Sequence, residues 1–348
     1  MTQIFQDTPA DIQRVAEILA GGGVVALPTE TVYGLAANAF DRSACGAIFE
    51  LKERPLNDPL IVHVANGNDV VRVAAMNSLA KALGEIFWPG PLTMVLAKNP
   101  SVPDIVTAGL SSVAVRVPRH PVLRKVLEAS GLAVAAPSAN PFGYVSPTRV
   151  EHIVQTFGDK LDHILDGGPC EIGLESTVLD LRDPRQPVIL RPGAVSQERI
   201  DAALGGSAGV ACRSMHRDVA EGSGLPSPGL SERHYSTNTP LLILDPLTCA
   251  TLHKTGEDLT NRWAAVLFRK DLHRAAEIRE IGATEVSWLS ETGNSDEAAR
   301  TLFDLLQSLD NRGFDVIYAE TAPPGGLGAA INDRLARAAS GRRWVSGK

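Results

Sequence analysis

Apolar residues near the start of the chain recur at the spacing of a helix and are followed by a short apolar run. Thr8 is a typical helix cap, and Pro9 occupies a first-turn position that needs no N–H partner. The apolar positions repeat every three or four residues: Ile12, Val15, Ala16 and Leu19. Glycines at 21–23 end this predicted helix, and residues 24–27 (VVAL) form a predicted buried strand.

The same alternation of apolar strand and amphipathic helix continues to about residue 204. A second helix is predicted around Leu79, Leu83 and Phe87. Further strands are predicted at residues 60–64, 92–96, 113–117, 133–136, 177–181 and 187–190. This order of elements predicts one α/β domain with a mixed sheet over residues 1–204.

The periodicity disappears between residues 205 and 240, where glycine, proline and serine are interspersed with charge. This composition indicates a linker that is too varied for a plain Gly/Ser tether. Beyond it, strands are predicted at 241–244, 264–268 and 316–318, and helices around 298–309 and 329–339. Residues 241–348 are therefore expected to form a second, smaller α/β domain.

Composition restricts the class of protein. The chain has 348 residues, of which 44% are hydrophobic, so it can bury large cores, and its net charge of −7 argues against a surface that binds nucleic acid throughout. The four cysteines are widely separated and form no C-x-x-C pair, which favours reduced thiols over a zinc or disulfide framework. Without a basic secretory start or an apolar run of bilayer length, the chain is expected to be cytoplasmic.

Three polar stretches carry the candidate chemistry: residues 28–35 (PTETVYGL), 52–55 (KERP) and 137–140 (PSAN). The first and third follow apolar strands, and strand ends are where α/β proteins place their sites. The chain contains no G-x-x-x-x-G-K-[ST], no G-x-G-x-x-G at a strand-to-helix turn, no G-x-S-x-G and no H-E-x-x-H. Nucleotide binding by the usual glycine-rich loops, serine esterase chemistry and zinc proteolysis are therefore disfavoured.

The basic residues allow two interpretations. Lys52 and Arg54 are either solvated charges at a helix end or a fork for anions, stiffened by Pro55. Arg116 interrupts a strand, and a buried arginine needs either a carboxylate of the protein or an anionic ligand. His63 lies within another strand, where a histidine is more often a core residue than a ligand.

The hydroxyl and amide groups are equally open. Ser138 and Asn140 either cap a turn or bind phosphate oxygens or an adenine edge, and residues 175–177 (EST) have the same two interpretations. Arg191 adds a cation at another strand end. Cations at several strand ends indicate a concave anion site for a ligand such as a nucleoside triphosphate.

Taken together, these segments resemble the threonylcarbamoyl-AMP synthases of the longer type, in which a YrdC-like domain is followed by a linker and a small second domain. The resemblance is strong over about residues 10–240. It rests on PTETVYGL, K-x-R, S-x-N, DPLIVH at 58–63, AVRVP at 114–118, ESTV at 175–178 and LRPG at 190–193. A similarity to the family's C-terminal end, at residues 328–335, carries no catalytic expectation.

The resemblance implies a fold and an activity. The fold is a twisted mixed sheet around a concave cationic cavity, plus a Rossmann-like second domain. The activity is nucleotidyl transfer: L-threonine, bicarbonate and ATP, with Mg²⁺ beside the triphosphate, give threonylcarbamoyl-AMP and pyrophosphate. A separate transferase then passes the threonylcarbamoyl group to an adenosine of tRNA.

The resemblance also implies roles for individual residues. Lys52 and Arg54 would be catalytic. Threonine would be bound by Thr31, His63, Arg116 and Ser176. ATP would be bound by Arg54, Asp58, Ser112, Ser138, Asn140, Ser146, Arg191, His234 and Tyr235. Asp58 replaces an asparagine that is common in related chains, and an acid beside phosphates needs a cation or metal as a partner.

Residues 205–240 would act as a lid over the nucleotide, because 227–229 (SPG) and 233–235 (RHY) resemble the family's S-P-G-x-x-x-x-H-Y segment. Residues 230–232 depart from that segment. Two alternatives to the synthase stay open. One is a module that binds tRNA or double-stranded RNA without turnover, and the other is a carbamoyltransferase, although the large partner domain of such enzymes has no counterpart here.

Overall fold

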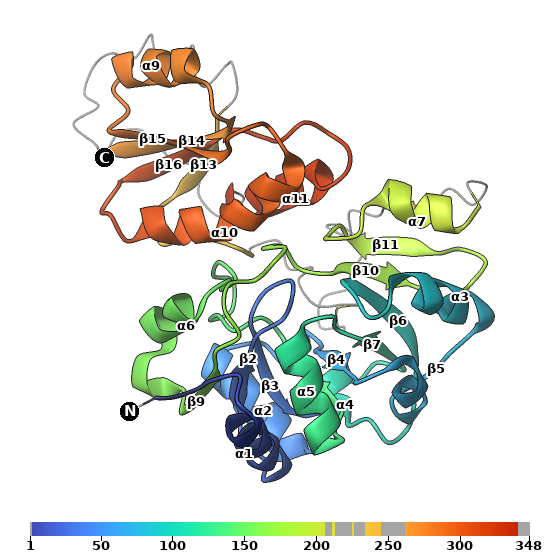
Figure 1. Cartoon of the computed structure of the whole chain (residues 1–348). Coiled ribbons are helices and arrows are strands. Elements are labelled where there is room, and N and C mark those ends of the chain that lie inside the picture. Colours follow the sequence, from blue (N-terminus) through green and yellow to red (C-terminus); the bar gives the residue numbers. More distant parts are fainter. Residues whose placement is uncertain (1, 206–210, 213–224, 226–233, 245–261, 340–348) are drawn as a thin grey trace. The chain divides into compact units, whose positions relative to one another are not determined.

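The computed structural model describes residues 2–205, 211–212, 225, 234–244 and 262–339 (Figure 1). The chain divides into two compact units. The first comprises residues 1–142 and 146–231, and the second comprises residues 143–145 and 232–348. Most of the predicted lid, residues 205–240, lies outside the described residues, so its role stays a prediction.

In the described part of the first unit, twelve strands form one sheet. Their order across the sheet is β1, β9, β2, β3, β8, β4, β7, β6, β10, β11 and β12, with β5 paired to β6. The strands are β1 (Gln3–Phe5), β2 (Val25–Leu27), β3 (Gly34–Asn38), β4 (Ile61–His63), β5 (Ala74–Ala75), β6 (Leu92–Lys98), β7 (Ser112–Arg116), β8 (Val134–Ala135), β9 (His163–Leu165), β10 (Thr177–Asp180), β11 (Val188–Arg191) and β12 (Ala211–Cys212). Strands β4 and β7 are parallel, whereas β6 and β7 are antiparallel, which confirms the predicted mixed sheet.

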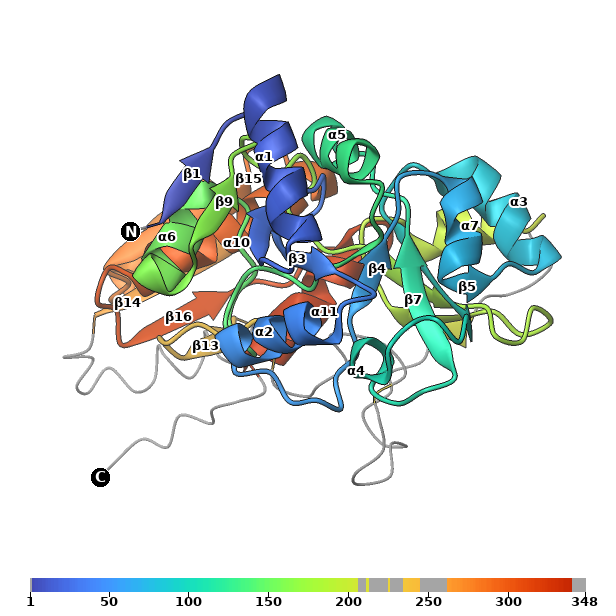
Figure 2. The same cartoon turned by 90° about the horizontal axis from the view of Figure 1, so that it is seen from below.

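Helices cover this sheet on both faces. They are α1 (Pro9–Ala20), α2 (Arg42–Lys52), α3 (Ser78–Phe87), α4 (Asp104–Thr107), α5 (Pro121–Ser130), α6 (Val150–Phe157) and α7 (Gln197–Ala203), with 3-10 turns η1 (Gly67–Arg72) and η2 (Gly158–Lys160). Helices α1 and α5 lie side by side and share one core cluster, whereas α2 and α3 belong to another (Figures 1 and 2). Along β2, Val25 and Leu27 belong to the first cluster and Ala26 to the second, as the two-residue period of a strand requires.

The first helix forms for the reason the sequence indicates. The hydroxyl of Thr8 accepts a hydrogen bond from the backbone N–H of Asp11 at 3.2 Å, and Pro9 begins the helix. Its predicted apolar positions are the buried ones.

Strand β3 is not predicted from the sequence. This strand begins at Gly34, inside the polar stretch 28–35, and pairs antiparallel with β2. Its sequence, GLAAN, contains no β-branched or aromatic residue that would mark it as a strand. Residues 28–33 are therefore the turn of a hairpin between β2 and β3. This turn carries Thr29, Glu30 and Thr31.

The second unit contains, in its described part, four parallel strands in the order β13, β16, β14 and β15. They are β13 (Leu241–Ile243), β14 (Trp263–Arg269), β15 (Glu285–Ser290) and β16 (Val316–Ala319), with helices α9 (Leu272–Glu280), α10 (Ser295–Asp310) and α11 (Gly328–Ala339). This confirms the predicted second α/β fold, although α9 and β15 are missed. None of the helices described in either unit is long and apolar enough to cross a membrane.

Candidate active site

Lys52 ends α2 and is almost completely buried. Its Nζ donates hydrogen bonds to the carbonyl oxygens of Ser138 and Asn140. An ammonium group has three hydrogens, so one remains for another acceptor. Burial, and then the neighbouring Arg54, hold the pKa of Lys52 well below its usual range, and Asp58 opposes this only in part. Lys52 thus joins two of the three predicted polar stretches.

Arg54 turns back toward the sheet directly after α2. The reversal is made by Glu53, which caps the helix in the left-handed region at φ 53°. The Arg54 guanidinium lies 2.9 Å from the Asp58 carboxylate and donates to the carbonyl oxygens of Asp58 and Pro59. Both members of the ion pair are buried. The interpretation of Lys52 and Arg54 as solvated charges is therefore wrong, and Asp58 has the cation that an acid in this position requires.

Arg116 lies at the end of β7 and is held by three groups. Its Nη2 lies 2.6 Å from Glu30 Oε1, its Nη1 donates to Thr31 Oγ1 at 2.9 Å, and its Nε donates to the carbonyl oxygen of Gly90 at 3.1 Å. Of the two anions that the sequence left open for Arg116, the carboxylate of the protein is present.

The partner of Arg116, Glu30, is not among the site residues predicted from the sequence. Burial by itself would raise the pKa of Glu30, but the charge of Arg116 and hydrogen bonds, one of them from the backbone N–H of Arg119, outweigh it and lower that pKa. The sequence did contain a signal for this residue. Glu30 is an acid between two threonines directly after a predicted buried strand, and Arg116 is a strand arginine for which the sequence required an anion.

His63, in β4, is aligned with Arg116 in the parallel pair β4 and β7, so the two side chains leave the sheet on the same face. Burial, and then the charge of Arg116, lower the pKa of His63 to about 3. The imidazole is therefore neutral near pH 7. Its Nδ1 is buried and has no hydrogen-bond partner among the described residues.

Ser176 is fixed between strands β6, β10 and β11. Its hydroxyl lies 2.7 Å from that of Thr93, and Arg191 donates to its carbonyl oxygen at 2.9 Å. Close packing explains why the LRPG segment ends in a glycine, Gly193. A Cβ at this position would lie 2.5 Å from backbone atoms of residues 175–177. Arg191 and Ser176, predicted for different substrates, are thus in direct contact.

Of the remaining residues predicted in the first unit, Ser112, Asn140 and Ser146 are buried and Ser138 is partly buried. Ser146 donates to Glu175 Oε1 at 2.6 Å, which gives Glu175 a structural role that the sequence left undecided. Ser112 begins β7, and Asn140 donates to the carbonyl oxygen of Pro141 at 2.8 Å. Gly34 and Ser138 form an isolated antiparallel bridge, which joins the first and third polar stretches.

His234 and Tyr235 belong to the second unit. Tyr235 is fully buried at φ 63°, stacks on Phe303 with ring centroids 5.6 Å apart, and has the Arg334 guanidinium 4.9 Å from its ring centre. The His234 ring lies 4.1 Å from that of Tyr235. These contacts anchor the end of the predicted lid within the second unit, and the contribution of both residues to ATP binding stays a prediction.

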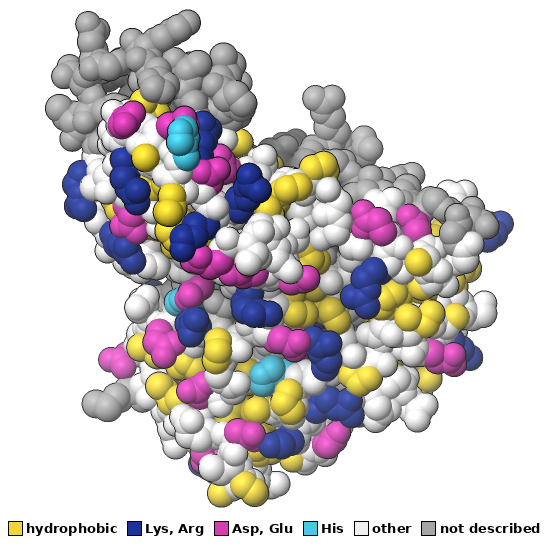
Figure 3. Space-filling model, turned by 45° about the horizontal axis from the view of Figure 1, so that its top comes forward, with side chains coloured by type: hydrophobic (Ala, Val, Ile, Leu, Met, Phe, Trp, Pro, Cys, Tyr) yellow, Lys and Arg dark blue, Asp and Glu magenta, His cyan; other side chains and the backbone are white. Residues whose placement is uncertain are grey.

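On the face shown in Figure 3, Lys and Arg side chains are interspersed with Asp and Glu side chains.

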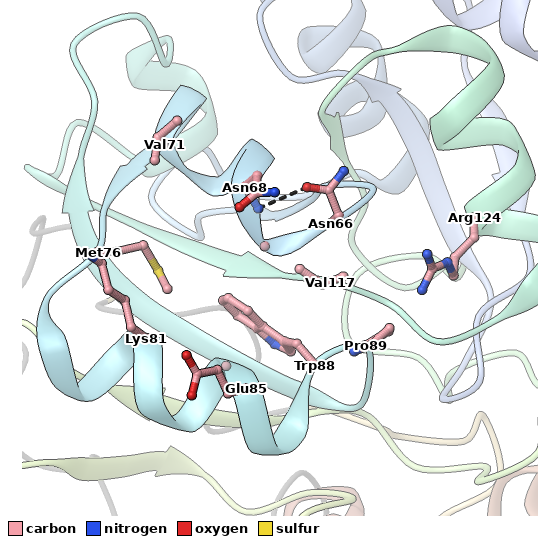
Figure 4. Close-up of a pocket in the computed structure, with 12 residues that line it drawn as sticks. Asn66, Asn68, Val71, Met76, Lys81, Glu85, Trp88, Pro89, Val117 and Arg124 are labelled. Atoms are coloured by element: carbon pink, nitrogen blue, oxygen red, sulfur yellow. Dashed lines mark hydrogen bonds between the residues drawn. The ribbon is translucent and has the colours of Figure 1, made fainter.

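A pocket of about 670 Å³ lies between η1, α3 and α5, with Trp88, Lys81 and Arg124 among its lining residues (Figure 4). None of the predicted site residues lines it. Its Pro89 wall precedes Gly90, whose carbonyl oxygen accepts from Arg116.

Comparison with protein families assigns both parts of the chain. A model of the Sua5, YciO and YrdC proteins, described as telomere recombination, matches residues 17–193. A second model, described as the threonylcarbamoyl-AMP synthase C-terminal domain, matches residues 195–340.

Individual relatives match over almost their whole length. A threonylcarbamoyl-AMP synthase of Pyrococcus abyssi is 39% identical, with 96% of this chain and 95% of that protein aligned. One of Bacillus subtilis is 38% identical, with 98% and 96% aligned. The crystal structure of P. abyssi Sua5 complexed with L-threonine superimposes with a TM-score of 0.85 at 34% identity, covering 97% of each chain.

Proposed function

The chain belongs to the threonylcarbamoyl-AMP synthase family, and on that basis we propose that it makes threonylcarbamoyl-AMP and pyrophosphate from L-threonine, bicarbonate and ATP. It is an enzyme that transfers a nucleotidyl group. The observation that carries the proposal is the similarity to such synthases over nearly the whole chain, including both units. The buried cations of the first unit are consistent with it.

The chemistry explains why such cations are needed. The amine of threonine combines with bicarbonate to give a carbamate and water, and a carbamate oxygen then attacks the α-phosphorus of ATP as pyrophosphate leaves. Two anions have to approach each other, so fixed positive charge at their meeting point stabilises the transition state. Lys52 and Arg54 are proposed to supply that charge. The anionic oxygens of the triphosphate and bicarbonate would raise the lowered pKa of Lys52 and so favour its ammonium form. Burial removes competing water and strengthens the interaction.

The remaining hydrogen of the Lys52 ammonium group is proposed to point to a phosphate or bicarbonate oxygen. Its other two hydrogens hold the backbone of Ser138 and Asn140 in place. Lys52 would therefore hold the nucleotide-binding backbone in place and also neutralise charge on the bound phosphate or bicarbonate. The other residues proposed on this side are Arg54, Asp58, Ser112, Ser138, Asn140, Ser146, Arg191, His234 and Tyr235.

On the threonine side we propose Thr31, His63, Arg116 and Ser176. A guanidinium has five N–H donors, and the contacts of Arg116 with Gly90, Thr31 and Glu30 employ three of them. Two donors remain, which is the number that a carboxylate takes in a bidentate pair. Arg116 is therefore proposed to bind the α-carboxylate of threonine.

Mg²⁺ binds triphosphates through their own oxygens, so we propose that it arrives with ATP. No three His, Cys, Asp or Glu side chains are grouped around a metal position in the part of the chain that the structure describes. We assign no step of the reaction to the ion. Because the product is a mixed anhydride and so a reactive acyl donor, we propose that a separate transferase carries its threonylcarbamoyl group to tRNA. Further proposals are a contact of this chain with that tRNA and a cytoplasmic location.

The test is a pyrophosphate-release assay with ATP, in which amino acids are compared with and without bicarbonate. We expect release to require both threonine and bicarbonate. Release that is independent of threonine would exclude the proposed reaction. Release that requires another amino acid would retain the reaction type and change the substrate.

A further inference from the structure

Besides Nη2 of Arg116 itself, which meets Glu30 as an ion pair, two buried polar atoms around Arg116 have no hydrogen-bond partner among the described residues: Glu30 Oε2 and His63 Nδ1. Glu30 forms the ion pair with Arg116, and His63 is aligned with Arg116 across the sheet. Buried polar atoms are nearly always paired in folded proteins. Two unpaired acceptors, next to a guanidinium with two donors to spare, therefore indicate a place for a polar ligand.

The groups around this place complement the polar groups of an amino acid with a hydroxyl side chain. The spare donors of Arg116 match a carboxylate. Glu30 Oε2 is an acceptor with negative charge, which matches an α-ammonium group. His63 is neutral, so its Nδ1 can accept from a hydroxyl group without adding charge.

We propose that Glu30 determines specificity at the threonine site: its Oε2 accepts a hydrogen bond from the substrate's amino group and so selects α-amino acids over carboxylic acids that lack the amine. This inference rests on the proposed function. It gives a role in binding to a residue that otherwise only neutralises Arg116.

The geometry around Glu30 keeps this oxygen in place. The Oε1 atom is held by the Arg116 guanidinium and by the backbone N–H of Arg119 at 3.0 Å. The turn itself is fixed by Thr29, whose hydroxyl accepts from the backbone N–H groups of Thr31 at 3.0 Å and Val32 at 3.1 Å. Glu30 is 1% exposed, so water does not compete for Oε2.

The charge balance also favours selection. Arg116 without Glu30 would attract any small carboxylate, whereas the ion pair has no net charge. A ligand that brings only a carboxylate therefore leaves a buried negative charge uncompensated, which is costly in a buried site. A zwitterion compensates both members of the pair, and this is why an amine is required.

The test is a binding measurement by calorimetry on the full chain. The ligands are L-threonine and (R)-3-hydroxybutyrate, which keeps the carboxylate, hydroxyl and methyl groups but lacks the amine. In the wild type we expect threonine to bind at least about tenfold more tightly, as for one charge-assisted hydrogen bond. Glu30→Gln should reduce this preference by about the same factor. Equal binding of the two ligands by the wild type would overturn the inference without any variant.

Glu171→Gln is the matched control, because Glu171 is an exposed glutamate that pairs with the Arg119 side chain at 2.9 Å. It should keep the wild-type preference. A role of Glu30 in folding alone would weaken both ligands equally and leave the preference unchanged, which would also overturn the inference. Failure of the wild type to bind or use threonine at all would instead refute the proposed function.

Discussion

Replacement of Gly193 by alanine tests how closely the chain just after β11 must approach the segment that carries Ser176. A Cβ at this position would lie 2.5 Å from the carbonyl oxygen of Glu175, the carbonyl carbon of Ser176 and the backbone nitrogen of Thr177. Ordinary contact begins at 3.4 Å, so one segment has to move by about 0.9 Å. All three atoms are backbone atoms, and no side-chain rotation relieves the overlap.

A shift of this size reaches the site directly. Ser176 hydrogen bonds with Thr93 and Arg191 at 2.7 and 2.9 Å, and neither bond survives a displacement of nearly 1 Å without rearrangement. Overpacking costs about 1–3 kcal/mol of unfolding free energy, and a 1 Å misplacement at an active site costs about 100-fold in rate. We therefore expect Gly193→Ala to lower Tm by several degrees and kcat/KM by one to two orders of magnitude.

The measurements are thermal denaturation and pyrophosphate release at varied threonine and ATP. Gly67→Ala is the control, because a Cβ at Gly67 would meet no atom within 4 Å. If Gly193→Ala retains the Tm and kcat/KM of Gly67→Ala, the close approach at Gly193 does not constrain the site and the reasoning is wrong.

Three further predictions concern the buried charges. Arg116→Ala should chiefly raise KM for threonine and Lys52→Ala should chiefly lower kcat; equal weakening of ATP by both in steady-state assays would contradict this division. Asp58→Asn should lower the unfolding free energy, measured in urea, by up to about 3–5 kcal/mol, since it removes the carboxylate that lies 2.9 Å from the buried guanidinium of Arg54; an unchanged midpoint would argue against the ion pair. The lowered pKa of Glu30 means that its carboxylate stabilises the fold above the ordinary value of 4.5 and loses this effect as the pH falls through the lowered pKa. The advantage of the wild type over Glu30→Gln in unfolding free energy should therefore be present at pH 7 and shrink below pH 4.5, and an advantage independent of pH would exclude a charge effect.

The sequence predicts those helices that bury one face and those strands that are buried along most of their length. The helix of residues 9–20 and the strands around β6 and β7 are such cases, because apolar periodicity records which face is buried. Strand β3 lacks this record, since its sequence, GLAAN, contains no β-branched or aromatic residue. The pairing order of the sheet depends on contacts between segments far apart in sequence.

The site shows where local patterns stop being informative. Arg116 can be recognised from the sequence as a cation that needs an anion, because a charge inside an apolar strand is costly unless it is paired. Its partner is 86 positions away in the chain and lies in a hairpin turn whose polar residues look like ordinary turn residues. Only the register of β4 with β7, and the hairpin of β2 with β3, bring Glu30, Arg116 and His63 together. The unpaired acceptors of Glu30 and His63 exist only in that arrangement, so a specificity role for Glu30 is a property of the fold and not of any motif.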